Sequence, residues 1–139
     1  MIYEKVLDAL EFLKRYRNIT PEALSGDRKL LGSILWYLYT VVQGSIDLGL
    51  KVISKLKLKI PESYADVFLV LKDEGIIPEN LARELIKMAK FRHILAHIYF
   101  KLDLKIVCDI IREKLGEIEE YLQTLADALK QRNIRIEEL

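Results

Sequence analysis

The side chains best suited to chemistry in this chain are Arg92 and His97, which lie five positions apart in one predicted helix. A histidine titrates near neutrality, so His97 could accept or donate a proton. A fixed arginine presents a planar pair of donors that can stabilise negative charge on phosphate oxygens. Together these two residue types are sufficient to cleave RNA without a metal, by attack of the 2′-hydroxyl on the adjacent phosphorus.

Arg92 is unusual because it interrupts an apolar stripe. From Leu81 to Ala96 apolar residues recur at steps of three and four, which predicts that Arg92 lies on the buried side of the helix. A guanidinium does not lose its proton in a protein, so a buried one needs an anion or several acceptors.

The spacing of the pair constrains how it could act. Residues five apart on a regular helix point about 140° away from each other. Either the helix loosens before His97, or two copies of the chain bring two arginines and two histidines to one cleft. A homodimer would also cover the surplus apolar surface of the predicted helix over residues 28–58.

Considered alone, without any family resemblance, the same residues are better explained by structural roles. Arg92 could hold helices together by meeting an acid such as Asp47, and His97 could cap its own helix. Tyr99 could be an ordinary core or interface aromatic. His93 and His97 are four apart, but no glutamate lies between them as in His-Glu-x-x-His, so we expect no metal site and no cofactor.

The periodicity predicts an all-α chain, an antiparallel bundle of about five helices forming a single domain over residues 1–139. The predicted helices are residues 2–17, 28–58, 63–74, 78–98 and 104–132, with one short turn after Thr20 and a frayed tail over 133–139. Predicted N-caps and one left-handed C-cap mark the boundaries: Thr20, Asp27, Glu62 or Ser63, Asp103 and Gly75.

Composition excludes several classes of protein. Hydrophobic residues make up 51% and charged residues 31% of the chain, which is typical of a globular protein rather than a disordered one. The single cysteine, Cys108, excludes an internal disulfide and indicates a buried thiol. No leader opens the chain, and Gln43 and Asp47 interrupt the longest apolar stretch, so we expect a cytoplasmic protein without a membrane span.

Positive charge is concentrated near Arg92 and His97. Between Arg83 and Lys105 six lysine or arginine residues oppose two acids, a local charge of +4 in a chain of net charge +1. Such a patch suits a phosphate backbone, although a run of this kind is more often a solvated helix face.

The pattern Arg92-x4-His97-x-Tyr99 in a small helical chain resembles the HEPN ribonucleases, and most closely the HepT-like toxins. Further matching stretches are Ile46–Gly49, Pro61–Phe68, Leu71–Ile77, Leu81-Ala82, Met88 and Phe91-Arg92. His93 departs from the family, in which an asparagine usually follows the arginine.

The resemblance implies a function. It implies a metal-independent endoribonuclease toxin of a type VII pair, with Arg92 and His97 catalytic, His93 supporting and a composite cleft in a homodimer. It implies an RNA substrate, tRNA or mRNA, and a partner, an MntA-like nucleotidyltransferase antitoxin that transfers AMP to Tyr99. The alternative function is a non-catalytic docking subunit for such a nucleotidyltransferase.

Overall fold

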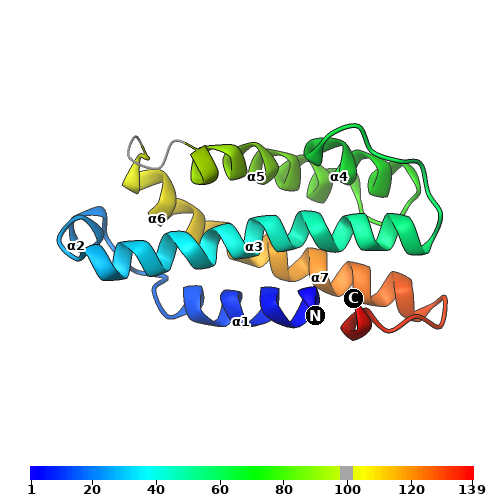
Figure 1. Cartoon of the computed structure of the whole chain (residues 1–139), viewed down its shortest axis with the longest axis horizontal. Helices are drawn as coiled ribbons and strands as arrows, with labels where there is room; N and C mark the ends of the chain where they lie inside the picture. Colours follow the sequence, from blue (N-terminus) through cyan, green and yellow to red (C-terminus); the bar gives the residue numbers. More distant parts are fainter. Residues whose placement is uncertain (98–101) are drawn as a thin grey trace.

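The computed structural model describes residues 1–97 and 102–139, with the side chain of His97 also outside the described part. Tyr99 therefore lies outside the described residues. Within these ranges there is no β-strand. The described elements are α1 (Ile2–Lys14), α2 (Pro21–Ser25), α3 (Arg28–Lys55), α4 (Tyr64–Asp73), α5 (Glu79–His97), α6 (Leu104–Glu113), α7 (Leu115–Lys130) and the 3-10 helix η2 (Ile136–Glu138) (Figure 1).

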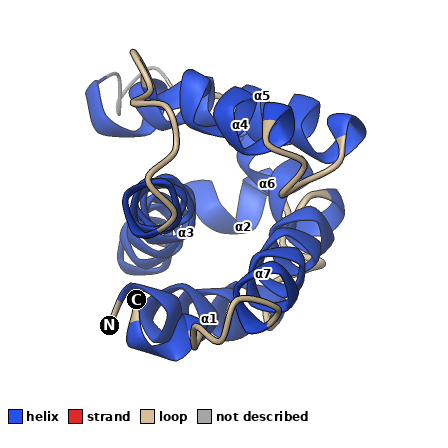
Figure 2. Cartoon of the chain, turned by 90° about the vertical axis from the view of Figure 1, so that its right-hand side faces the viewer, coloured by secondary structure: helices blue, strands red, loops and turns tan. Residues whose placement is uncertain are grey.

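Helix α3 is the longest of the described helices and lies at the centre of the bundle. It has 28 residues and is about 42 Å long at 1.5 Å per residue. The long helices α1, α3, α5 and α7 alternate in direction along the chain (Figure 1). Viewed nearly along α3, the pair α4–α5 lies on one side and the pair α1–α7 on the other (Figure 2). These arrangements confirm the predicted all-α antiparallel bundle.

The helix boundaries follow local sequence signals. The side chains of Thr20, Asp27, Ser63 and Asp103 each accept a hydrogen bond from a backbone N–H in the first turn of the following helix. Gly75 follows α4 with φ of 73°, a left-handed conformation that favours glycine. All five predicted caps are therefore confirmed.

Close approach at two glycines fixes α3 against its neighbours. A Cβ added at Gly44 would overlap the Cγ2 atom of Val6 on α1. A Cβ added at Gly49 would lie 2.6 Å from Val67 Cγ1 and 2.8 Å from the hydroxyl oxygen of Tyr121. Tyr121 is fully buried, and its hydroxyl donates to the Ser45 carbonyl at 2.8 Å. These contacts set the rotation of α3 about its axis.

The described residues form seven α-helices, and the prediction of one continuous helix over residues 104–132 is wrong. The turn after Thr20 is a short helix, and the predicted helix over residues 104–132 breaks at Lys114, which has φ of −110° and ψ of −10°. Gly116 is unfavourable in a helix, and the break lets α6 contact α2 while α7 contacts α3 and α5. The apolar periodicity continues across Lys114, so the sequence pattern does not indicate the break.

The predicted frayed tail is also wrong. Residues 136–138 form η2, and the side chains of Ile136 and Leu139 are buried in the core. The N–H of Ile2 donates to the carbonyl of Leu139 at 3.0 Å, which brings the two ends of the chain together (Figure 1).

Two further expectations are tested by the fold. Cys108 is buried, and burial raises the pKa of its thiol, so the prediction of a buried thiol is confirmed. None of the helices in the described part of the chain has the length and apolar character needed to cross a membrane.

Two glycine-to-alanine variants test the packing of α3. We expect Gly49→Ala to lower the free energy of unfolding by about 1–3 kcal/mol, because the new methyl group overpacks the core at Val67 and Tyr121. In contrast, Gly116→Ala has no atom within 4 Å of the new Cβ and should raise stability by about 0.5–1 kcal/mol through helix propensity. Urea denaturation measures both, and equal effects of the two variants would contradict this packing.

Candidate active site

The guanidinium of Arg92 lies between α5 and α3. The residue is half-buried, and its Nε donates to Oε1 of Gln43 at 2.7 Å. Its Nη2 lies 3.5 Å from the hydroxyl of Tyr39, a longer and weaker contact. The predicted position of Arg92 on the inward side of its helix is therefore confirmed, and its acceptors come from α3.

Gln43 connects Arg92 to an acid. Its Nε2 donates to Oδ1 of Asp47 at 2.8 Å, one helical turn along α3. An ionised aspartate only accepts and an arginine only donates, so Gln43 must present its oxygen to Arg92 and its amide nitrogen to Asp47. Arg92 thus meets Asp47 through Gln43 rather than directly. We call Arg92, Gln43 and Asp47 the tether.

Two tyrosine rings flank the guanidinium. The Cζ atom of Arg92 lies 5.0 Å from the ring centroid of Tyr64, which begins α4, and 5.8 Å from that of Tyr39. Both separations are within the range of cation–π attraction. No residue in the described part of the chain accepts a hydrogen bond from Nη1. This arrangement holds a fixed positive group while leaving donor capacity for an anion.

Two hollows adjoin the tether on the surface of α3. One has a volume of about 210 Å³ and is lined by Gln43 and Asp47 together with residues of α1. The other, of about 410 Å³, is lined by Leu95 and Ala96 of α5. Trp36 and Tyr39 line both hollows, and Trp36 is 64% exposed. The site is therefore open to a large ligand and not an enclosed pocket.

The structure describes the other predicted site residues only in part. His93 is an exposed residue of α5 beside Arg92. His97 is the last residue of α5, which stays helical up to that position, so the helix does not loosen before His97. Positions 92 and 97 are then about 140° apart around the axis.

Glu84, one of the two acids in the basic stretch, is paired with two lysines. Lys87 contacts Glu84 at 3.3 Å, and Lys114 of the α6–α7 break contacts the same carboxylate at 3.3 Å. Hydrogen bonds from Lys114 and Lys87 lower the pKa of Glu84. Because Glu84 is one of the two acids already counted and Lys114 lies outside the counted stretch, these contacts leave the local charge of +4 unchanged. Across the described residues, no group of three or more His, Cys, Asp and Glu side chains could hold a metal ion.

Comparison with known proteins shows the family. The sequence model described as Ribonuclease HepT-like matches residues 6–125, so the chain belongs to the HepT-like ribonuclease family.

Individual relatives and structures agree with this assignment. A protein named mRNA nuclease HepT from Shewanella oneidensis is 25% identical over 127 residues, which cover 90% of this chain and 96% of that protein. A putative RNase from Archaeoglobus fulgidus is also 25% identical, covering 91% of this chain and 95% of that protein. The solved structure of a tri-AMPylated Shewanella oneidensis HEPN toxin in complex with MNT antitoxin has a TM-score of 0.79 at 22% identity, covering 89% of this chain and 92% of that chain. That likeness shows that the fold is HEPN-like.

Sequence reasoning missed Gln43, Tyr39 and Tyr64 as partners of Arg92. The four-residue spacing of Gln43 and Asp47 on a helix is a usable signal, because it lets an amide donate to a carboxylate one turn away. Which polar residue of α3 meets Arg92 depends on how α3 and α5 pack, and the sequence alone does not specify that packing.

A double-mutant cycle tests the tether. We expect Arg92→Ala and Gln43→Ala to be coupled by about 0.5–1.5 kcal/mol in the free energy of unfolding, because each removes the partner of the other in one charge-assisted hydrogen bond. Gln123→Ala is the matched control, since Gln123 donates to Asp127 at 2.9 Å on α7 without an arginine. A coupling of zero between Arg92 and Gln43, measured by urea denaturation, would contradict the geometry.

Proposed function

We propose that this chain is a metal-independent endoribonuclease, the toxin of a type VII toxin–antitoxin pair of the HepT–MntA kind. Residues 1–139 form one HepT-like domain, and the protein acts in the cytoplasm. The observation that carries the proposal is the tether, which holds a guanidinium at the surface between α3 and α5 with Nη1 facing no acceptor among the described residues.

The chemistry follows from the two residue types. The 2′-hydroxyl of RNA loses its proton to a base and attacks the adjacent phosphorus, and the bond from phosphorus to the 5′-oxygen breaks. His97 serves in proton transfer, as the base or as the acid that protonates the leaving 5′-oxygen. Arg92 stabilises the negative charge that builds on the non-bridging oxygens. His93 supports the cleft, and the products are a 2′,3′-cyclic phosphate and a 5′-hydroxyl.

A homodimer completes the site in this proposal. Positions 92 and 97 lie about 140° apart around the axis of α5, which favours a cleft that two copies of the chain share. The hollow lined by Gly32, Leu35, Trp36 and Leu95 is mostly apolar and lies between α3 and α5, and Trp36 is exposed there. A second copy seated there would exclude water from Trp36 and face its own Arg92 and His97 toward the cleft.

The partner in the proposal is an MntA-like nucleotidyltransferase that transfers AMP to Tyr99. Support comes from the HEPN toxin of similar fold, which is described as tri-AMPylated and in complex with an MNT antitoxin. AMP groups two residues beyond His97 would add negative charge and bulk beside the cleft and so repel RNA. The substrate is an RNA, either tRNA by family analogy or mRNA as the name of the Shewanella relative indicates.

One observation favours the alternative function, a non-catalytic docking subunit for the nucleotidyltransferase. Gln43, Tyr39 and Tyr64 give Arg92 several partners within its own chain, as a structural arginine would have. In that case the arginine holds α3, α4 and α5 together, and substitution of Arg92 affects stability without affecting any reaction.

Cleavage of RNA in excess chelator separates the two functions. We expect purified wild-type protein to cleave, and Arg92→Ala and His97→Ala each to lower the rate by about 10²–10⁴-fold, because each removes one chemical role. Arg112→Ala is the matched control, since the acids that pair with Arg112 of α6 among the described residues are Asp109 and Glu113, both at the surface. Mass spectrometry first establishes that Tyr99 carries no AMP. Equal inactivity of unmodified wild type and variants would contradict the ribonuclease function and favour the docking subunit.

A further inference from the structure

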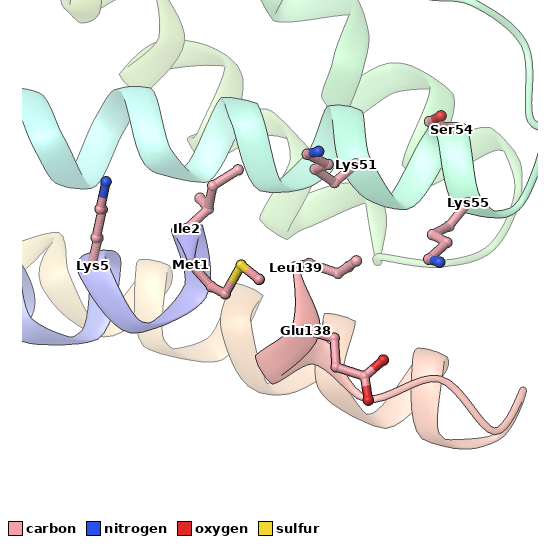
Figure 3. A pocket seen from close by; sticks show the side chains of 8 residues that line it. All are labelled: Met1, Ile2, Lys5, Lys51, Ser54, Lys55, Glu138 and Leu139. Carbon is pink, nitrogen blue, oxygen red and sulfur yellow. The ribbon is translucent and has the colours of Figure 1, made fainter.

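A third hollow lies where α1, α3 and η2 meet, at the other end of α3 from α2 (Figures 1 and 3). It has a volume of about 510 Å³. We call it the lysine hollow. Its lining residues are Met1, Ile2, Lys5, Lys51, Ser54, Lys55, Glu138 and Leu139.

The lysine hollow carries uncompensated positive charge. Lys51 and Lys55 extend from α3, and Lys5 extends from α1 toward α3 (Figure 3). All three are exposed, and no carboxylate of the described residues lies within 4.0 Å of their ammonium groups. Glu138 is the one acidic side chain in the lining, and Figure 3 shows its carboxylate pointing away from α3. An anion could therefore bind without displacing an existing ion pair.

The lysine hollow is continuous with the candidate active site. Ile2 and Lys5 line both the lysine hollow and the smaller hollow that contains Gln43 and Asp47. On α3, positions 43, 47, 51 and 55 advance by four residues, about 6 Å at each step. The seam between α1 and α3 therefore leads from the tether to the two lysines over about 18 Å. We call this path the α1–α3 groove.

We propose that the α1–α3 groove binds the phosphodiester backbone of the RNA beyond the scissile position, with Lys5, Lys51 and Lys55 contacting its phosphates. The inference rests on the proposed ribonuclease function and extends it by naming where the rest of the strand lies. Because the net charge of the whole chain is only +1, affinity for a polyanion must come from a local set of cations such as this one. An acidic protein surface would suit the same lysines, but continuity with a site for a phosphate favours RNA.

The experiment measures RNA binding in a chain that cannot cleave. A labelled single-stranded RNA of mixed sequence is titrated with His97→Ala protein at several salt concentrations, and fluorescence anisotropy gives the dissociation constant. The logarithm of the affinity falls with the logarithm of the salt concentration by about 0.7 for each phosphate neutralised on a single strand. Adding Lys51→Gln and Lys55→Gln should make this slope shallower by about 1.4, and adding Lys5→Gln should extend the change to about 2.1.

Arg28→Gln with Lys29→Gln is the matched control. It removes the same charge from the exposed start of the same helix, about 33 Å from Lys51, and should leave the slope unchanged. Circular dichroism establishes that each variant is folded. If the salt slope is unchanged in both double variants, or becomes shallower by the same amount in both, the α1–α3 groove is not the RNA-binding site.

Failure of the groove and failure of the proposed function give different results. If wild type cleaves RNA but the lysine variants keep the full salt slope, only the groove is wrong. If wild type neither binds nor cleaves RNA, the ribonuclease function is wrong and the groove is wrong with it. If the lysine variants lose binding to the nucleotidyltransferase while the RNA slope is unchanged, the lysine hollow is a protein contact, and the groove is again overturned.

Discussion

The interaction on which the structure depends is the hydrogen bond from Arg92 to Gln43, backed by Asp47. Arg92 lies in an apolar stripe of α5, and its guanidinium keeps its charge there. The fold must therefore provide hydrogen-bond acceptors around Arg92, whereas the apolar residues of the stripe need only packing. Gln43 does this without placing a carboxylate directly against Arg92, so no direct ion pair within the described part of the chain competes for the guanidinium. Tyr39 and Tyr64 add attraction at the ring faces. The result is a positive group whose direction is fixed and whose charge remains available to an anion.

The rest of the bundle determines where that group points. Gly44 and Gly49 bring α3 close to α1, α4 and α7, and the buried hydroxyl of Tyr121 is bonded to the backbone of α3 at Ser45. These contacts fix one side of α3 in the core. Trp36, Gln43, Asp47 and the two lysines of α3 stay partly or fully exposed, and Gly44 lies beside them at the contact with α1. A single helix therefore links the hydrophobic core, the tether and the proposed α1–α3 groove.

Much of the fold could be predicted from the sequence because its signals are local. Thr20, Asp27, Ser63 and Asp103 act as caps wherever the helices later pack, and the apolar periodicity places Arg92 inward. The break at Lys114 was missed because the apolar stripe continues through it, and the buried Ile136 and Leu139 were missed because a short tail has no period. Gln43 was missed because its partnership with Arg92 depends on packing between α3 and α5. The roles of His97, His93 and Tyr99 stay predictions from the family resemblance.

The most direct test of the central claim is the rate of RNA cleavage at saturating RNA in chelator for Gln43→Leu. This variant keeps the guanidinium but removes the acceptor that orients it. Loss of orientation should lower the rate by about 10–10²-fold with little change in KM. Gln123→Leu removes a similar Gln–Asp contact on α7 and serves as the control. Cleavage at the wild-type rate by folded Gln43→Leu protein would show that the tether does not position Arg92 for the reaction.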